Sequence, residues 1–452
     1  MRGERGVGKV ERMPTSYLPY QPNQDLLLPH SLRDWLPEDH LAHFVSESID
    51  ALDLSAFYKR YEGGGARNQP FHPAMMVKVL IYAYATGVFS SRKIARKLHE
   101  DVAFRVLAAG NFPKHRTICD FRALHLDELA SLLLQVVKLA RECGLVKLGT
   151  IAVDGTKVRA NASKHKAMSY ERMQAAEIEL KAQIDALLAR AAQADKAEAN
   201  EPEVDIPAEI ARREQRLAAI RAAQARLQQR QREADVQRGR KSDDDNSAGP
   251  DAPGKKGGRP FKRAFGQPDP KAQDNFTDPD SRIMKTSAGF EQCYNAQTAV
   301  DAHAQIIVAA ELTNCAADSG QLKGMIEAVE QNLGSKPETA LADAGYRSEA
   351  ILAQLSESGI EVIVALGREG KQQVEVDVDK LPHTAAMAAK LQTDDGRDKY
   401  RRRKAIVEPP NAWIKQVLGF RQFSFRGIEK VRCEFKLVCA ALNLRRMATM
   451  RV

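Results

Sequence analysis

Two aspartates of this 452-residue chain come directly after short apolar segments. Asp154 follows residues 149–153 and Asp343 follows residues 339–342, with a glycine close behind each. Apolar, β-branched runs of this length are typical of buried strands that end in functional loops. If the two strands are neighbours in one sheet, both carboxylates lie at the same edge and need a countercharge. Mg²⁺ suits them, because it takes oxygen ligands and keeps some of its waters for reaction.

A third acid is expected near such a pair, and Glu408 is the best candidate because it lies in a strongly basic segment. Residues 400–452 hold 13 Lys and Arg against 3 Asp and Glu, and this excess accounts for the whole net charge of +9. Concentrated positive charge points to a polyanionic partner. Three carboxylates could hold two metal ions about 3.5 to 4 Å apart, which would clamp the attacking and leaving oxygens of a phosphodiester displacement.

The motifs around these acids resemble those of the DDE transposases of bacterial insertion sequences, in particular the branch with an InsH-like helical N-terminal domain. The resemblance covers most of residues 17–447. The matching segments are Ala152-Val153-Asp154-Gly155-Thr156-Lys157, Asn161-Ala162-Ser163, Asp278-Pro279-Asp280-Ser281-Arg282, Tyr294-Asn295-Ala296-Gln297, Leu341-Ala342-Asp343-Ala344-Gly345-Tyr346, and the set Tyr400, Arg403, Glu408 and Lys415.

The resemblance implies a ribonuclease-H-like catalytic fold in which Asp154, Asp343 and Glu408 form the catalytic, metal-binding triad. It also implies two Mg²⁺ ions, for which Mn²⁺ can substitute. The substrates it implies are the terminal inverted repeats of the element and its target DNA. The hairpin expected at 170–240 is interpreted as a structural or oligomerising arm that holds a homodimer on paired DNA ends. The rival interpretations are a ribonuclease-H-like DNA nuclease without strand transfer, and an inactive protein that only binds or bridges DNA.

The last set of matching residues corresponds to the family's Y-R-E-K signature, whose basic members hold DNA phosphates. Four residues separate Arg403 from Glu408 where the usual pattern has three, so either Arg402 or Arg403 fills the arginine position. Tyr400 and Lys415 are the other expected DNA contacts. Because proline is tolerated only in the first turn of a helix, Pro409-Pro410 predicts that the helix carrying Lys415 begins or kinks at residues 408–410.

The whole chain is expected to be an α/β protein with a mixed sheet flanked by helices, an all-helical N-terminal domain and a helical-hairpin insertion. The strands expected from the apolar runs are 149–155, 292–300, 305–312, 339–342 and 360–366, with helices at 319–333 and 349–356. The expected parts are a disordered N-terminus at 1–16, helical domain 17–146, catalytic domain 147–169 with 276–452, hairpin 170–240 and flexible connector 241–275.

Within the helical domain, residues 90–98 and 117–126 form a pair of short helices. The pair fits a helix-turn-helix reader of DNA, and simple helix packing explains its apolar positions equally well. Under the first interpretation, Arg92, Lys93 and Arg122 contact DNA. A zinc site at His115, Cys119 and His125 is not favoured, because no fourth ligand is apparent.

The expected cellular compartment is inferred from the lack of a membrane-spanning run, a secretory signal and paired cysteine motifs in the sequence. The longest apolar run is about 13 residues, too short to cross a bilayer, and the first residues do not resemble a secretory signal. The six cysteines form no C-x-x-C pair, so neither a disulfide scaffold nor a thiolate zinc site is indicated. We therefore expect a cytoplasmic, nucleoid-associated protein without a membrane partner.

Overall fold

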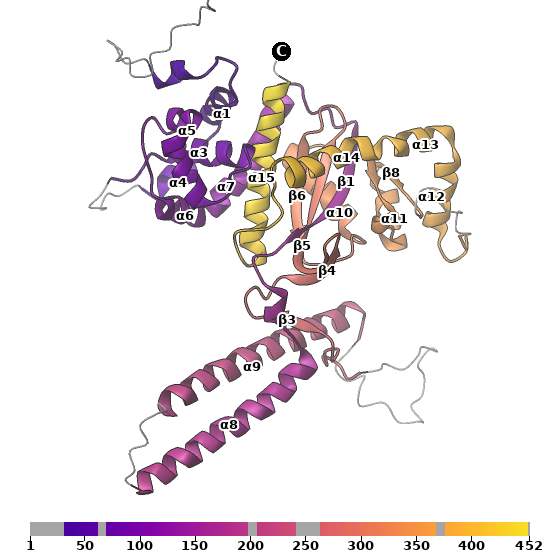
Figure 1. Cartoon of the computed structure of the whole chain (residues 1–452). Helices are drawn as coiled ribbons and strands as arrows, with labels where there is room; N and C mark the ends of the chain where they lie inside the picture. Colours follow the sequence, from indigo (N-terminus) through magenta and orange to yellow (C-terminus); the bar gives the residue numbers. More distant parts are fainter. Residues whose placement is uncertain (1–30, 62–68, 198–205, 241–262, 368–375, 451–452) are drawn as a thin grey trace, which may run out of the picture.

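The structure is a computed structural model that describes residues 31–61, 69–197, 206–240, 263–367 and 376–450 (Figure 1). The disordered segment expected at 1–16 lies outside these residues. A helical body, a sheet with flanking helices and a projecting hairpin make up the described chain. The domain boundaries given above stay a prediction.

A mixed sheet forms the centre of the second body, as the sequence predicts. Its order is β4-β5-β1-β7-β8, and β6 pairs with the second half of β5. β1, β7 and β8 are parallel, whereas β4, β5 and β6 join by antiparallel pairing. The strands are β1 (Thr150–Arg159), β4 (Arg282–Thr286), β5 (Gly289–Asp301), β6 (Ile307–Thr313), β7 (Thr339–Ala342) and β8 (Glu361–Val364).

Strand β1 is longer than the sequence suggests. The expected strand ends at Asp154 and Gly155, but β1 continues to Arg159, because β5 pairs with it as far as Cys293. The parallel pairing with β7 does end near the expected point, at Val153 and Ala342. Asp154 therefore marks the place where β1 loses one of its two neighbours, and not the end of the strand.

Helices cover both faces of the sheet. α14 contacts β1 and β5, while α10 packs on β5 and β6. The outer parallel strand β8 is covered by α11, α12 and α13. Their bounds are α10 (Gln321–Leu333), α11 (Glu349–Ser356), α12 (Pro382–Gln392), α13 (Asp394–Arg401) and α14 (Arg403–Ala412).

The N-terminal body is built from short helices around α3, whose side chains are buried on all sides. α4 is amphipathic, with Ile94 and Leu98 buried and Arg92, Lys93 and Arg96 exposed. The helices are α1 (Leu41–Asp50), α2 (Ser55–Lys59), α3 (Pro73–Ala85), α4 (Ser91–Glu100), α5 (Val102–Leu107), α6 (His115–Leu124) and α7 (Leu126–Glu142).

The last helix, α15 (Ile428–Thr449), lies between the two bodies (Figure 1). It packs on α7 and α3 on one side and on β6 on the other, and one continuous hydrophobic core includes all of them. Asn443 of α15 accepts from the backbone N–H of Ile307 at 2.9 Å and donates to its carbonyl at 2.8 Å. The helical body and the sheet are thus joined through α15.

The expected hairpin is present as α8 (Tyr170–Ala197) and α9 (Ile206–Gln237), which project from the sheet (Figure 1). The hairpin has its own hydrophobic core, which includes Met173 and Ile184 of α8 and Leu217 and Ile220 of α9. Its base is a small sheet of β2 (Ala167–Ser169) and β3 (Gln273–Asn275).

The connector expected at 241–275 is only partly outside the described residues. Its last residues form β3, and the fully buried Asp274 on that strand pairs with Arg226 and Arg230 of α9. The composition of this segment suggested flexibility. Composition alone could not show that residues 273–275 pair with β2. Within the described residues, no helix is long and apolar enough to cross a membrane.

Candidate active site

Asp154 and Asp343 each follow the last paired residue of the neighbouring parallel strands β1 and β7, so the condition that the sequence set for a carboxylate pair is met. The parallel register pairs Val153 of β1 with Ala342 of β7, so the next residue of each strand is an aspartate. Burial, followed by repulsion from the Asp343 carboxylate, raises the pKa of Asp154 to about 6. A carboxylate pair with such a raised pKa attracts a cation.

Helix α14 is held against this pair by Asn411. Its side-chain amide Nδ2 donates to Oδ2 of Asp154 at 3.2 Å, and its Oδ1 accepts from the Thr298 hydroxyl of β5 at 3.2 Å. Glu408 precedes Asn411 by three residues on the same helix and is exposed. Since residues three apart are neighbours on a helix surface, Glu408 lies beside Asn411 on α14, with its side chain exposed.

The two prolines do not start the helix. α14 begins at Arg403 and runs through Pro409 and Pro410, so the alternative that the helix begins at 408–410 is wrong, and the alternative of a kink there stays a prediction. A proline at 409 cannot donate to the carbonyl of Ala405, and the side chain of Gln305 donates to that carbonyl instead, at 2.6 Å. The helix then widens into a π-helical turn, η5 (Trp413–Val417), where the Leu418 N–H bonds to the Trp413 carbonyl.

The basic signature residues separate into buried and exposed positions. Arg403 is buried, its guanidinium stacks 5.9 Å from the centre of the Tyr400 ring, and its charge favours the ionised form of Asp154. Arg402 is exposed. Burial lowers the pKa of Lys415, and the negative charge of Asp154 acts in the opposite direction. The sequence left Arg402 and Arg403 as equal candidates, and the structure gives them different surroundings.

Comparison with protein families fits this geometry. A family model described as the transposase DDE domain matches residues 266–444, and one described as a transposase domain, DUF772, matches residues 30–124. The chain belongs to the DDE transposases of bacterial insertion sequences. Its catalytic fold is accordingly ribonuclease-H-like, with the central mixed sheet described above. Searches of curated proteins and of solved structures found no match.

Transposases of this family use divalent metal ions. The Asp154 and Asp343 pair fits such an ion, because its oxygens are hard ligands and its mutual repulsion needs a countercharge. Among the described residues, however, no three His, Cys, Asp or Glu side chains lie close enough together to hold a metal. Glu408 therefore shares the helix face of Asn411 without completing a three-ligand cluster with the pair.

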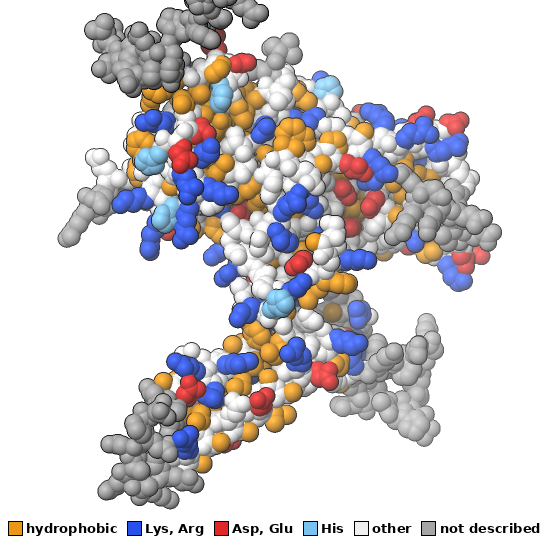
Figure 2. Space-filling model, in the orientation of Figure 1, with side chains coloured by type: hydrophobic (Ala, Val, Ile, Leu, Met, Phe, Trp, Pro, Cys, Tyr) orange, Lys and Arg blue, Asp and Glu red, His pale blue; other side chains and the backbone are white. Residues whose placement is uncertain are grey.

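The candidate DNA contacts of the transposase's helical body fall in two different environments. Arg92 and Lys93 are exposed on α4, and Figure 2 shows Lys and Arg side chains gathered over this region. Arg122 is buried instead. It donates to Glu434 of α15 at 3.2 Å and to the Ser424 hydroxyl at 2.6 Å, so its guanidinium is engaged inside the protein. The segments that enclose it could not be located from the local sequence.

The helix pair expected at 90–98 and 117–126 corresponds to α4 and α6, which contact each other. The short helix α5 lies between them in sequence and also packs on α4. The arrangement is compatible with DNA reading by α4, whose outer face is basic, and with the packing role that the apolar positions suggest.

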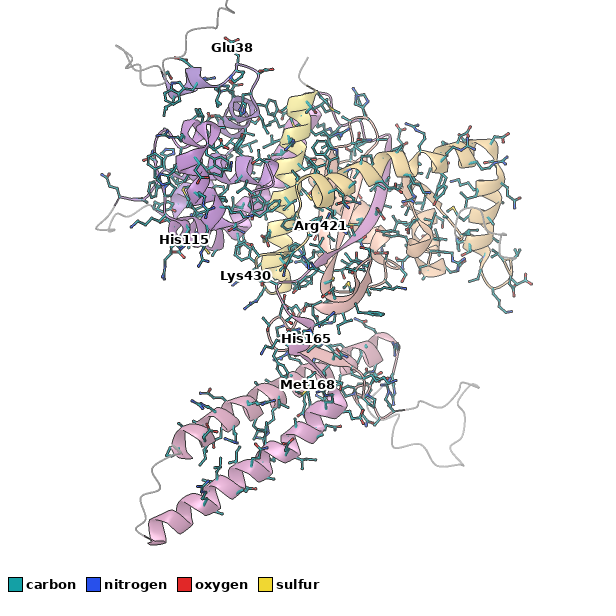
Figure 3. All side chains as sticks on the ribbon, in the orientation of Figure 1. Glu38, His115, His165, Met168, Arg421 and Lys430 are labelled. Carbon is teal, nitrogen blue, oxygen red and sulfur yellow. The ribbon has the colours of Figure 1, made fainter. Side chains whose placement is uncertain are left out.

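A basic strip in the transposase was missed by sequence reasoning. Residues 159–161 pair with residues 421–426 through backbone and side-chain hydrogen bonds, including Phe423 N–H to the Arg159 carbonyl and Asn161 Nδ2 to the Ser424 carbonyl. We define the basic strip as the cations on and beside these paired segments, namely Arg159, Lys164, Lys166, Arg421, Arg426 and Lys430. Figure 3 places Arg421 and Lys430 above the neck of the hairpin and His165 at that neck.

Proposed function

We propose that this transposase binds the terminal inverted repeats of its own insertion sequence, cleaves the DNA there and transfers the freed end to target DNA. The observation that carries the proposal is the junction of three elements. Asp154 and Asp343 follow the end of the parallel pairing of β1 and β7, and Asn411 attaches to Asp154 the helix that carries Glu408. Such carboxylate groups serve phosphodiester chemistry when they hold divalent ions.

In this proposal Asp154, Asp343 and Glu408 hold two Mg²⁺ ions, with Mn²⁺ as a substitute. Held there, such ions would activate a water and stabilise the charge that develops on the phosphate. The protein holds the acids in place through Asn411, which fixes one oxygen of Asp154. Water adds to the scissile phosphorus and the 3′ oxygen leaves, and the resulting 3′ hydroxyl then displaces an oxygen of a target phosphodiester.

The DNA is held by cations on two sides of the acids. Lys415, Arg402 and Tyr400 contact the phosphates next to the scissile bond, while Arg403, which stacks on the Tyr400 ring, balances the charge of the carboxylates. The basic strip continues this surface toward the neck, and Arg92 and Lys93 of α4 contact the repeat farther from the cut. Backbone contacts of this kind position the duplex without reading its sequence.

We propose further that a homodimer assembles on paired ends, with the α8–α9 hairpin serving as an arm between subunits. A cytoplasmic, nucleoid-associated location follows from the proposed DNA substrates. The oligomeric state is measured by light scattering with and without end DNA. A dimer that forms only with DNA supports synapsis, whereas a monomer in both conditions contradicts it.

The test uses duplexes carrying the DNA that flanks this gene, with Asp154→Asn, Asp343→Asn and Glu408→Gln beside the wild type. Each substitution should abolish divalent-dependent nicking and leave DNA binding within about twofold. Persistent nicking in any of them contradicts the assignment of that acid. Joining of the cut end to a plasmid separates a transposase from a nuclease without strand transfer, and the inactive-protein interpretation predicts no cutting by the wild type.

A further inference from the structure

Asp318 is a carboxylate beside the active site that has no role in the acid triad. It lies in the loop between β6 and α10, and one of its oxygens accepts hydrogen bonds from three side chains of β1 and β5. Oδ1 accepts from Asn295 Nδ2 at 2.6 Å, from Gln297 Nε2 at 2.8 Å and from Lys157 Nζ at 3.4 Å. The loop is thus bonded to both β1 and β5.

Asp318 lies on the sheet face opposite α14. Successive residues of a strand point to opposite faces, and Asp154 turns toward Asn411 whereas Lys157 turns toward Asp318. The carboxylate nevertheless reaches the sheet edge where the acids lie. A Cβ added at Gly155 would be 2.5 Å from Asp318 Oδ1, and one added at Gly345 would be 3.5 Å from its Oδ2.

The bond to Asp318 decides which way the Gln297 amide points. Since a carboxylate only accepts, the amide must turn Nε2 toward Asp318 and Oε1 away from it. That Oε1 accepts from the hydroxyl of Tyr346, which is buried. A chain of hydrogen bonds therefore runs from Asp318 through Gln297 to Tyr346.

Tyr346 ends the short turn that begins with Asp343. The turn is a 3₁₀ segment, Ala344–Tyr346, in which the Gly345 N–H donates to Asp343 Oδ1 at 2.8 Å. Fixing the Tyr346 ring at one end of the turn fixes the backbone that presents the Asp343 carboxylate at the other. Burial and the charges of Asp318, Asp154 and Asp343 raise the pKa of Tyr346, so its hydroxyl stays a donor.

We propose that Asp318 is a positioning residue of the active site, which sets the Asp343 turn through Gln297 and Tyr346 and steadies β1 beside Asp154 through Lys157. The inference rests on the proposed function, because positioning matters only if the two acids bind the metal ions. Groups that orient metal ligands typically change metal affinity by about 10- to 100-fold when removed. A residue that merely stabilises the fold would lower the melting temperature without changing metal affinity.

The test measures the Mg²⁺ or Mn²⁺ concentration that half-saturates two responses, the metal-induced rise in melting temperature and the nicking of end DNA. Asp318→Asn and Tyr346→Phe should each raise that concentration about tenfold. Asp301→Asn is the matched control, since Asp301 also bonds backbone N–H groups from a loop, at Leu148 and His303, but lies outside the chain of bonds. It should lower stability and leave the half-saturating concentration unchanged.

An exchange of the amide and the carboxylate provides a second check. Gln297→Glu alone places two carboxylates together and should weaken metal binding. In the double variant with Asp318→Asn, the amide introduced at 318 donates to the carboxylate introduced at 297, which still accepts from Tyr346. The half-saturating metal concentration should then return to within about threefold of the wild-type value. Failure of this rescue, or an Asp318→Asn protein with normal metal response, overturns the positioning role.

The outcomes also separate this inference from the proposed function. Loss of nicking in Asp154→Asn together with an unchanged metal response in Asp318→Asn leaves the transposase assignment standing and removes the positioning role. A wild-type protein that shows no metal response contradicts the metal assignment and the positioning role together.

Discussion

Asn411 donates a hydrogen bond of 3.2 Å to Oδ2 of Asp154, across 257 positions of the sequence. This hydrogen bond connects Asp154, the first acid of the proposed triad, to the helix that carries Glu408, the proposed last one. It orients the carboxylate through Oδ2, and the remaining lone pairs of the two oxygens can serve a metal ion. Asn411 is itself bonded to Thr298, so the helix is attached to both β1 and β5.

The raised pKa of Asp154 predicts a pH-dependent stability in the absence of metal. Its pKa is about 6 in the folded protein against 3.8 for an ordinary aspartate, so folding disfavours the ionised form. Stability is therefore full below about pH 4 and falls as the pH rises through 6, by up to about 2 to 3 kcal/mol. Denaturant unfolding in EDTA at pH 5 and pH 7.5 measures about half of this change, roughly 1.4 kcal/mol, because the rest is lost between pH 4 and pH 5.

Asp154→Asn should remove this pH dependence and be more stable than the wild type at pH 7.5 without metal. Added Mg²⁺ should stabilise the wild type and not the variant, because the ion compensates a charge that the amide lacks. A variant that is less stable than the wild type at pH 7.5 would show that burial of the carboxylate is not the dominant effect.

Arg122→Met should cost about 3 to 5 kcal/mol, since it leaves the buried carboxylate of Glu434 without its cation. Arg122→Met with Glu434→Gln should recover part of that loss. Chemical denaturation of the three variants, Glu434→Gln included, measures both values. DNA affinity of the folded fraction should stay at the wild-type level, and a selective loss of DNA binding would instead restore Arg122 as a DNA contact.

Gly155→Ala should destabilise the protein by about 1 to 3 kcal/mol, because the new methyl group would lie 2.4 Å from Gln297 Nε2 and 2.5 Å from Asp318 Oδ1. Gly324→Ala in α10 is the control, because nothing lies within 4 Å of its added Cβ. There alanine should stabilise the helix by up to about 1 kcal/mol. Thermal melts would contradict the crowding at 155 if both variants gained stability.

Removing cations of the basic strip should reduce the salt dependence of DNA binding. Lys166→Ala, Arg421→Ala and Lys430→Ala should each lower the slope of log affinity against log salt by about 0.9 for every phosphate that the variant no longer neutralises. Lys380→Ala and Arg397→Ala, which remove exposed cations paired with nearby aspartates, serve as controls. Equal slopes in both groups would remove the strip from the DNA path.

Much of the sheet could be predicted because each strand shows its own local pattern. β5, β6, β7 and β8 lie within a few residues of the expected segments, and α11 spans Glu349–Ser356 as expected. The continuation of β1 beyond Asp154 could not be predicted. It depends on pairing with β5, which lies more than a hundred residues later in the sequence.

The side-chain environments depended still more on distant partners. The sequence indicated the neighbouring positions of Asp154 and Asp343, because both follow strand signals. It could not show that Arg122 is enclosed by α15, nor that Gln305 replaces the hydrogen bond missing at Pro409. Both interactions join segments that meet only in the folded chain.

The concentration of charge after residue 400 was an incomplete guide to the DNA surface. Several of these cations are half-buried and bonded to other parts of the protein, as in the pairs of Arg432 and Lys436 with Glu311 and the bond from Arg445 to the Ala85 carbonyl. A count of charges cannot distinguish such residues from Arg421 and Lys430, which are exposed.

The position of α15 has a consequence for the synthesis of the protein. The helical body and the sheet both leave the ribosome before α15, yet their apolar surfaces pack on it. Until residues 428–449 emerge, those surfaces have no native partner, and assembly of the two bodies must wait. Nascent chains arrested before residue 428 should therefore bind chaperones and remain sensitive to protease, while the α8–α9 hairpin, which has its own core, can fold earlier.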